Sequence, residues 1–310
     1  MGHREPDLAA SAEHQDGLSH PPSLAHAPPD RPEILVAMRA AVLGSPVAHS
    51  LSPVLHSAAY AALGLADWHY GAHECDENGL EGFVAGLGPE WAGLSLTMPL
   101  KRVALDVARE VSPLVVATGA ANTLVLTDGR RYADNTDVAG LVAALRGAGA
   151  PPAGRAVVLG AGGTAQATLA ALAQLGIRDV DVLVRSTART GELRAAAGRL
   201  GVSPGITDDL LDPARVRAAL ARADVVVSTL PKGAADGLTG VRPGAVVLDV
   251  VYAPWPTAFA AAAGAAGARV VSGLEMLLHQ AVAQVELMTG RTPPVAAMRD
   301  ALDAAVAARA

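Results

Sequence analysis

The 310-residue sequence has little cysteine, few aromatic residues and no long apolar run. The single cysteine, Cys75, excludes an internal disulfide and a cysteine-rich metal site, and we predict no metal site. No uninterrupted apolar segment approaches the roughly 18 residues that span a bilayer, so no membrane partner is expected. A net charge of −6 argues against nucleic acid as the main partner, because nucleic-acid-binding surfaces are basic. Without disulfides or a secretion signal, we expect a cytoplasmic protein.

The first 37 residues differ in composition from the rest of the chain. They are rich in Pro, His, Ser and Asp, show no periodicity, and carry histidines at irregular spacing. We interpret residues 1–37 as a disordered tail without a metal site. Met38 directly precedes the first predicted strand and is a candidate translation start.

After this tail, apolar runs typical of buried strands alternate with segments of helical periodicity. Such alternation predicts an α/β fold with mostly parallel sheets. A strand also begins at Asn122. The other predicted strands are 39–43, 68–74, 93–97, 156–159, 180–184, 224–228, 245–251 and 269–272.

The stretch VVLGAGGTAQATLAAL, residues 157–172, predicts a dinucleotide site. An apolar run leads into a glycine turn and then into residues at helical spacing, the pattern of strand, phosphate-binding turn and helix. Gly160 permits the tight turn, Gly162 lets the backbone approach a pyrophosphate, and Ala165 is small where helix meets strand. Unpaired N–H groups at the helix N-terminus face the anion. The predicted cofactor-binding residues of this turn are Gly160, Ala161, Gly162, Gly163, Thr164 and Ala165.

The end of the following strand favours NADP over NAD. An NAD site usually carries Asp or Glu there for the ribose hydroxyls, but this chain has Arg185 and Ser186, with Arg189 shortly after. A guanidinium matches phosphate oxygens bidentately, which suits a 2′-phosphate. Asp179 and Asp181 lie toward the other end of the strand. The alternative is that Arg185 is an ordinary solvated arginine.

Polar residues gather at strand-to-helix junctions of the first half. Ser50 and Ser52 lie beside free N–H groups and could hold a small anion, although helix capping alone would explain Ser52. Lys101 follows the third strand, where open α/β sheets place their chemistry. Asp137 lies in the first turn of a helix, whose dipole would keep it ionised, unless it is simply the N-cap. Gln280 has apolar neighbours, and a buried Gln needs a partner.

Taken together, these segments resemble the shikimate dehydrogenase family. The resemblance runs from Leu43 to about Pro294, and several ordered motifs are more specific than one. The motifs are Gly44-Ser45-Pro46 through His49-Ser50-Leu51-Ser52-Pro53 with His56, Leu96-Thr97-Met98-Pro99-Leu100-Lys101, Ala121-Asn122-Thr123, Asn135-Thr136-Asp137, Asp249 to Tyr252, and Gly273 to Gln280.

The resemblance implies a function and site. It implies reversible reduction of 3-dehydroshikimate to shikimate with NADPH, on the route to aromatic amino acids. Lys101 would be the acid–base residue, paired with Asp137. Ser50 and Ser52 would hold the substrate carboxylate, with Tyr252 nearby. The resemblance further implies ring-hydroxyl contacts from Thr97, Asn122, Asp137 and Gln280, and cofactor contacts from Val250 and Gly273.

It also implies two domains with a deep cleft between them. The substrate-binding catalytic domain would comprise residues 38–137 and 273–310, and the Rossmann-type NADP-binding domain residues 138–272. Hinge closure about these boundaries is expected on binding. We expect a monomer or a homodimer.

The chain departs from the family pattern at four places: Ser95 replaces a usual asparagine, Val138 and Glu275 replace glycines, and Val184-Arg185-Ser186 replaces Asn-Arg-Thr. Two other functions therefore stay open. One is a quinate/shikimate dehydrogenase using NAD, although Ser52 and Arg185 disfavour it. The other is a catalytically silent dinucleotide-binding sensor, which would need neither Lys101 nor Asp137.

Overall fold

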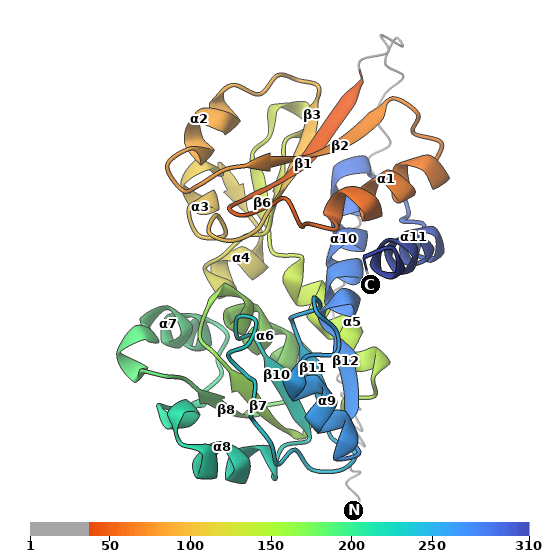
Figure 1. Cartoon of the computed structure of the whole chain (residues 1–310). Coiled ribbons are helices and arrows are strands. Elements are labelled where there is room, and N and C mark those ends of the chain that lie inside the picture. The colour runs from red at the N-terminus through yellow and green to blue at the C-terminus, as the bar shows by residue number, and fades with distance from the viewer. Residues whose placement is uncertain (1–36, 310) are drawn as a thin grey trace, which may run out of the picture. The chain divides into compact units, whose positions relative to one another are not determined.

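The computed structural model describes residues 37–309 (Figure 1). The predicted tail, apart from Ala37, lies outside the described residues, as do its histidines. In the described part of the chain, the strands form two six-stranded sheets. Figure 1 shows helices beside both sheets, and the α/β fold class predicted from the sequence is confirmed.

The first sheet has the strand order β2-β1-β3-β5-β6-β4. β1 pairs in parallel with β2 and β3, whereas β5 is antiparallel to both β3 and β6. The expectation of mostly parallel pairing is confirmed, and β5 is the exception among the described strands. The short connection from β5 to β6 cannot carry a parallel crossover, so these two strands pair antiparallel. The strands are β1 (Met38–Gly44), β2 (Trp68–Glu74), β3 (Trp91–Leu96), β4 (Glu110–Val111), β5 (Thr123–Val125) and β6 (Tyr132–Asp134).

The second sheet is parallel throughout, with the order β12-β11-β10-β7-β8-β9. The chain winds from β7 to one edge and then resumes at β10 on the other side, which is the Rossmann arrangement. Its central strands read as continuous apolar runs because helices cover both faces. The strands are β7 (Arg155–Leu159), β8 (Asp179–Leu183), β9 (Gly205–Thr207), β10 (Val225–Ser228), β11 (Val246–Asp249) and β12 (Arg269–Ser272).

The α-helices lie between these strands and at the C-terminal end of the described chain (Figure 1). They are α1 (Ser52–Ala62), α2 (Leu80–Ala85), α3 (Ala104–Val107), α4 (Pro113–Thr118), α5 (Asp137–Gly147), α6 (Gly163–Gln174), α7 (Gly191–Arg199), α8 (Pro213–Leu220), α9 (Ala258–Ala265), α10 (Gly273–Thr289) and α11 (Val295–Ala307). Within residues 37–309, no helix combines the length and apolarity that crossing a bilayer demands.

Helices α5 and α10 pack at unusually close range. A Cβ added at Gly140 of α5 would lie only 2.6 Å from the Met276 carbonyl oxygen of α10 and 3.1 Å from the Gln280 nitrogen. A glycine is therefore required where the two backbones meet. This contact fixes the start of α5, which carries Asp137, against the middle of α10, which carries Gln280.

The domain boundaries predicted from the sequence lie one residue inside α5 and at the first residue of α10. Residues 37–309 nevertheless belong to one compact unit by their contacts. The division into residues 38–137 with 273–310 and residues 138–272 therefore stays a prediction, as does closure about it.

Replacing Gly140 with alanine should destabilise the protein, because the new methyl group has no space between α5 and α10. We expect a loss of about 1–3 kcal/mol and a fall in Tm of roughly 2–10 °C, measured by thermal unfolding. Gly147→Ala, on the same helix, is the matched control, since a Cβ there meets nothing within 4 Å. Equal Tm values for the two variants would contradict this account of the helix contact.

Candidate active site

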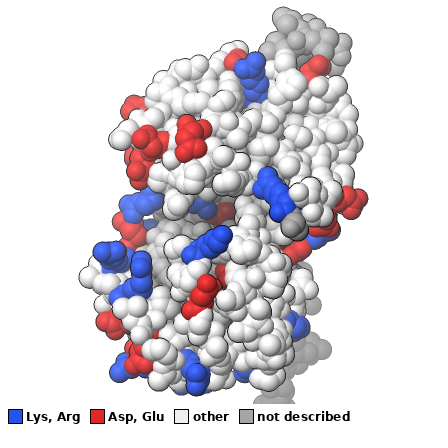
Figure 2. All heavy atoms as spheres, in the orientation of Figure 1, with Lys and Arg blue, Asp and Glu red and all other residues white. Residues whose placement is uncertain are grey.

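A cavity of about 340 Å³ brings together the catalytic and substrate-binding residues predicted from the sequence. Figure 2 shows a hollow across the middle of the displayed face, with basic side chains near its edges. The cavity is lined by Ser50, Ser52, Thr97, Lys101, Asn122, Asp137, Tyr252 and Gln280, together with Thr164, Val250 and Gly273 of the predicted cofactor set. Chain segments far apart in the sequence thus contribute to one site.

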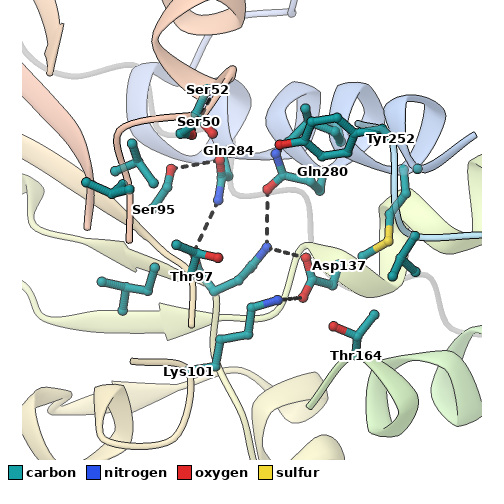
Figure 3. A pocket seen from close by; sticks show the side chains of 18 of the residues that line it. Ser50, Ser52, Ser95, Thr97, Lys101, Asp137, Thr164, Tyr252, Gln280 and Gln284 are labelled. Atoms are coloured by element: carbon teal, nitrogen blue, oxygen red, sulfur yellow. Dashed lines mark hydrogen bonds and ion pairs between the residues drawn. The ribbon is translucent and has the colours of Figure 1, made fainter. Parts of the chain in front are cut away.

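Lys101 and Asp137 form an ion pair at the edge of this cavity (Figure 3). Lys101 Nζ lies 2.5 Å from Asp137 Oδ2, and the two side chains are 22% and 6% exposed. Asp137 is the first residue of α5 and Thr136 is its N-cap, so the alternative that Asp137 is the N-cap is wrong. The helix N-terminus places positive dipole charge beside the carboxylate. An ammonium group has three N–H donors, and the ion pair with Asp137 uses one of them. The others can act on a ligand while the ion pair stays in place.

Asn122 holds the other oxygen of the same carboxylate. Its Nδ2 donates to Asp137 Oδ1 at 2.9 Å and to Gln280 Oε1 at 3.3 Å. The Thr136 backbone N–H donates to Asn122 Oδ1 at 2.8 Å, which fixes the orientation of the amide because that N–H can only donate. Asp137 therefore accepts one hydrogen bond at each oxygen, from an amide and from an ammonium group.

The two serines lie where the loop after β1 enters α1. Ser52 is the first residue of α1 and Leu51 is the N-cap, so the interpretation of Ser52 as the helix cap is wrong. The Ser52 backbone N–H instead donates to Ser50 Oγ at 3.2 Å. The loop reaches the end of β3 because Gly44 lacks a side chain, and a Cβ there would lie 2.3 Å from Thr97 Cγ2. Both serines and Thr97 line the cavity.

Gln280 has the partner expected of a buried amide. It is 7% exposed, its Nε2 donates to the Leu277 carbonyl at 2.9 Å, and its Oε1 accepts from Asn122. Tyr252, half-buried after β11, lies beside it in Figure 3. Burial raises the pKa of the Tyr252 phenol, and the nearby Arg309 guanidinium opposes that rise. The phenol is therefore available as a neutral hydrogen-bonding group.

The glycine turn after β7 has a backbone that few other residues could adopt and that is accessible from outside. Gly160 has φ +108°, and a Cβ there would lie 2.5 Å from Thr229 Oγ1. Gly162 is the N-cap of α6, makes no side-chain cap, and borders open space. The first N–H groups of this helix therefore face a site where backbone can approach an anion. Ala161, Gly163, Thr164 and Ala165 follow the same turn, and Ala165 is fully buried against the sheet.

Arg185 and Arg189 follow the carboxyl end of β8, on the same side of the second sheet as the glycine turn. β7 and β8 pair in parallel, and the Gly160 backbone N–H bonds the Leu183 carbonyl, so Arg185 follows the strand beside the glycine turn. Arg185 and Arg189 are exposed, and within the described residues neither has an ion-pair partner. Ser186 between them is half-buried. As predicted, Asp179 and Asp181 lie toward the other end of β8. There both carboxylates approach Arg155, the first residue of β7.

Val250 and Gly273 meet where β11 ends and α10 begins. A Cβ at Gly273 would lie 2.1 Å from the Val250 carbonyl oxygen, so only glycine fits there. Glu275 binds Arg299 with two hydrogen bonds of 2.6 and 2.9 Å, which lower the pKa of its carboxyl group. This departure from the family pattern therefore serves to join α10 to α11. Val138, another departure, is fully buried in the core.

Gln284 lines the cavity but was absent from the sequence prediction. It lies one helical turn after Gln280 on α10, and this i,i+4 spacing could have revealed it. Ser95, noted in the sequence only as a departure, also lines the cavity and donates to Gln284 Oε1 at 2.8 Å.

Comparisons with known proteins agree with this geometry. Residues 42–124 match the family described as shikimate dehydrogenase substrate binding domain, and residues 273–302 match the shikimate 5′-dehydrogenase C-terminal domain. A relative named shikimate dehydrogenase (NADP(+)) from Moorella thermoacetica is 39% identical over 277 residues, covering 86% of this chain and 93% of its own.

Solved structures of known proteins match a similar share of the chain. Shikimate dehydrogenase from Mycobacterium tuberculosis has a TM-score of 0.79 and 47% identity, with 86% of this chain and 99% of that chain covered. Shikimate 5-dehydrogenase from Thermus thermophilus, solved in complex with NADP(H) and shikimate, has a TM-score of 0.74 and 33% identity, with the same coverage of 86% and 99%.

His56 lies behind the cavity and is fully buried. Its ring stacks on Tyr70 with centroids 3.9 Å apart, and its Nε2 lies 3.2 Å from Gln284 Oε1. Burial lowers the pKa of His56 from 6.5 to about 3, although the contact with Gln284 opposes this shift. The imidazole is therefore neutral in the folded protein near neutral pH.

This depressed pKa predicts an acid-dependent loss of stability. Between pH 6.5 and about 3, His56 is protonated in the unfolded chain but not in the folded chain. The stability that the neutral imidazole contributes to the folded state is therefore fully present above pH 6.5 and is lost as the pH falls toward 3. Replacing His56 with Gln should reduce the slope of unfolding free energy against pH in this range by up to ~1.4 kcal/mol per unit. The measurement is urea unfolding at several pH values, with the exposed His69→Gln as control. An unchanged slope in His56→Gln would contradict the assignment.

Proposed function

The chain belongs to the shikimate dehydrogenase family, and from this premise we propose that it catalyses the reversible NADPH-dependent reduction of 3-dehydroshikimate to shikimate. This is a step of aromatic amino acid biosynthesis. The observation that carries the proposal is that the Lys101–Asp137 ion pair lines the same cavity as Thr164 at the start of α6. An acid–base pair thus lies beside a dinucleotide-binding turn.

The substrate would lie with its carboxylate toward Ser50 and Ser52. Both serines line the cavity on the side away from Lys101 in Figure 3. Two hydroxyls beside the start of α1 can bind a carboxylate, and the Tyr252 phenol can add a third donor. We infer that Thr97, Asn122, Asp137 and Gln280 bind the ring hydroxyls, because all four present polar side chains to the same cavity.

At Asn122, we infer that a substrate hydroxyl replaces Gln280 Oε1. This 3.3 Å contact is the longer of the two that Asn122 Nδ2 makes. The exchange would leave the bond from Asn122 to Asp137 intact. The Gln280 carbonyl would then be released to accept from the ligand.

Lys101 handles the proton in the proposed reaction. NADPH supplies the hydride when bound. As the ketone carbon is reduced, negative charge develops on its oxygen, and Lys101 Nζ donates the proton that neutralises it. Asp137 holds Nζ at 2.5 Å and so keeps the ammonium in place between turnovers. Lys101 is 22% exposed, which leaves it a route to regain a proton from water.

The residues around the glycine turn fit NADP. Gly160 and Gly162 leave the backbone accessible, and the uncapped α6 N-terminus can bind the pyrophosphate. Arg185, Ser186 and Arg189 follow the neighbouring strand and offer guanidinium and hydroxyl donors to the 2′-phosphate. The α6 N-terminus and Arg185 lie at the ends of paired strands, as one dinucleotide requires.

The alternatives receive less support. An NAD-dependent quinate/shikimate dehydrogenase has no 2′-phosphate for Arg185 and Arg189, which make no ion pair with any other residue in 37–309. A silent sensor would not need the buried, doubly hydrogen-bonded carboxylate of Asp137. Small molecules are the ligands in either enzyme. A cytoplasmic location and a monomeric or homodimeric state stay predictions from the sequence.

Lys101→Ala should lower kcat for shikimate oxidation by roughly 10² to 10⁴, the usual size of a general acid–base contribution. Substrate binding should be mostly retained. Asp137→Asn should lower both turnover and affinity, since its carboxylate also faces a ring hydroxyl. The double variant should be much less impaired than the product of the single effects, because the two residues act as a unit. Steady-state rates with shikimate and NADP measure all three.

Lys232→Ala is the matched control, since this exposed side chain is the other lysine of the chain. It should keep full turnover. Strictly multiplicative effects of Lys101→Ala and Asp137→Asn would show that the proton is handled by another group.

Arg185→Ala should raise the KM for NADP about tenfold to several hundredfold, because a charge-assisted phosphate contact is lost. The kinetics with NAD should hardly change. Arg178→Ala is the matched control, since Arg178 is an exposed arginine directly before β8 whereas Arg185 follows its end. Equal damage with both cofactors would mean that Arg185 has a structural role instead.

A further inference from the structure

Every polar position of the Gln284 side chain is engaged by the protein. Its Nε2 donates to the Asn122 carbonyl at 3.2 Å and to Thr123 Oγ1 at 3.0 Å. Its Oε1 accepts from Ser95 Oγ at 2.8 Å and lies 3.2 Å from His56 Nε2. A glutamine amide has two donor hydrogens and two acceptor lone pairs. Gln284 therefore has no polar capacity left for a substrate, although it lines the cavity.

The orientation of this amide is determined by its partners. A backbone carbonyl only accepts, so the NH₂ group must face Asn122 and the carbonyl must face Ser95. His56 consequently carries its hydrogen on Nε2, where it donates to Gln284. Tyr70 completes this side by donating from its phenol to Ser95 Oγ at 2.5 Å.

From Gln284 the hydrogen bonds continue from donor to acceptor until they reach the Asp137 carboxylate. Thr123 Oγ1 donates to Asn122 Oδ1 at 2.9 Å, and Asn122 Nδ2 donates to Asp137 Oδ1 at 2.9 Å. Each group thus accepts from the group before it and donates to the next. A chain of aligned donors that ends at a carboxylate stabilises the charge and orients it.

Gln280 differs from Gln284 although both lie on α10. One hydrogen of its Nε2 goes to the Leu277 carbonyl, and its Oε1 has the single 3.3 Å contact with Asn122. One donor hydrogen and acceptor capacity therefore remain. Two glutamines one helical turn apart are thus suited to different tasks.

We propose that Gln284 is a positioning residue: with Ser95 it orients Asn122 and thereby Asp137, and it does not bind the substrate itself. This inference rests on the proposed function, because Asp137 matters only if the Lys101 pair acts on a bound alcohol or ketone. It assigns substrate recognition on α10 to Gln280 alone.

The test replaces each glutamine with glutamate, which keeps the shape but removes the donors. Gln284→Glu places carboxylate oxygens against the Asn122 carbonyl and Thr123, so we expect kcat to fall about tenfold to a hundredfold with a smaller change in the KM for shikimate. Gln280→Glu is the matched variant one turn away, and its main effect should be on KM. A Gln284→Glu enzyme with normal kcat and a raised KM would overturn the proposal, since that pattern indicates substrate binding.

A double-mutant cycle with Asn122 provides the second readout. If Gln284 acts through Asn122, the effect of Gln284→Glu on kcat should shrink to less than about threefold in an Asn122→Ala background. An undiminished effect would overturn the proposal. If Gln284→Glu does not fold, Ser95→Ala takes its place in the same cycle, with an expected threefold to tenfold loss of kcat.

The assay of the unmodified protein separates the two claims. A protein that does not oxidise shikimate with NADP would refute the proposed function. An active protein whose Gln284 and Ser95 variants behave like the parent would refute the positioning role alone.

Discussion

The buried carboxylate of Asp137 is the group on which the arrangement of the cavity depends. Removing a carboxylate from water carries a desolvation penalty of several kcal/mol, and the side chain is only 6% exposed. Three features offset this penalty: the Lys101 ammonium, the Asn122 amide and the N-terminus of α5. Each comes from a different element, namely the chain after β3, the residue before β5 and the junction of β6 with α5. The first sheet thus brings the Lys101 ammonium, the Asn122 amide and the start of α5 together around the Asp137 carboxylate.

Helix α10 then connects this point to the rest of the protein. It can approach α5 closely because Gly140 has no side chain, and it presents Gln280 and Gln284 to the cavity from one face. Its first residue, Gly273, meets the Val250 carbonyl, so the same helix joins the edge of the second sheet to the substrate side. A shift of α10 would therefore disturb the Asn122 amide and the cofactor edge together. This coupling gives a physical reason for the glycines at these two contacts.

Sequence reasoning recovered the features that depend on local chemistry. The glycine turn, the Lys101 and Asp137 positions and most strands follow from short-range pattern, because strand ends and helix starts are encoded by neighbouring residues. What it missed depends on contacts between distant residues. Ser95 meets Gln284 across 189 positions, and the neutral state of His56 follows from burial that no local motif reports. The antiparallel pairing of β5 depends on how the chain returns to the sheet, which local pattern does not report. Helix α1 begins one residue before the start predicted from the sequence.

The two binding regions differ in how firmly their polar groups are held. Around Asp137, buried amides and hydroxyls fix one another through directional bonds, so a change in one group must be transmitted to the next. At the cofactor edge, Arg185 and Arg189 are exposed, and a solvated guanidinium can be replaced without leaving a buried partner unsatisfied. Substitution of these exposed arginines should therefore leave the packing of the sheet undisturbed. Substitutions around Asp137 should instead disturb the buried groups that are bonded to it.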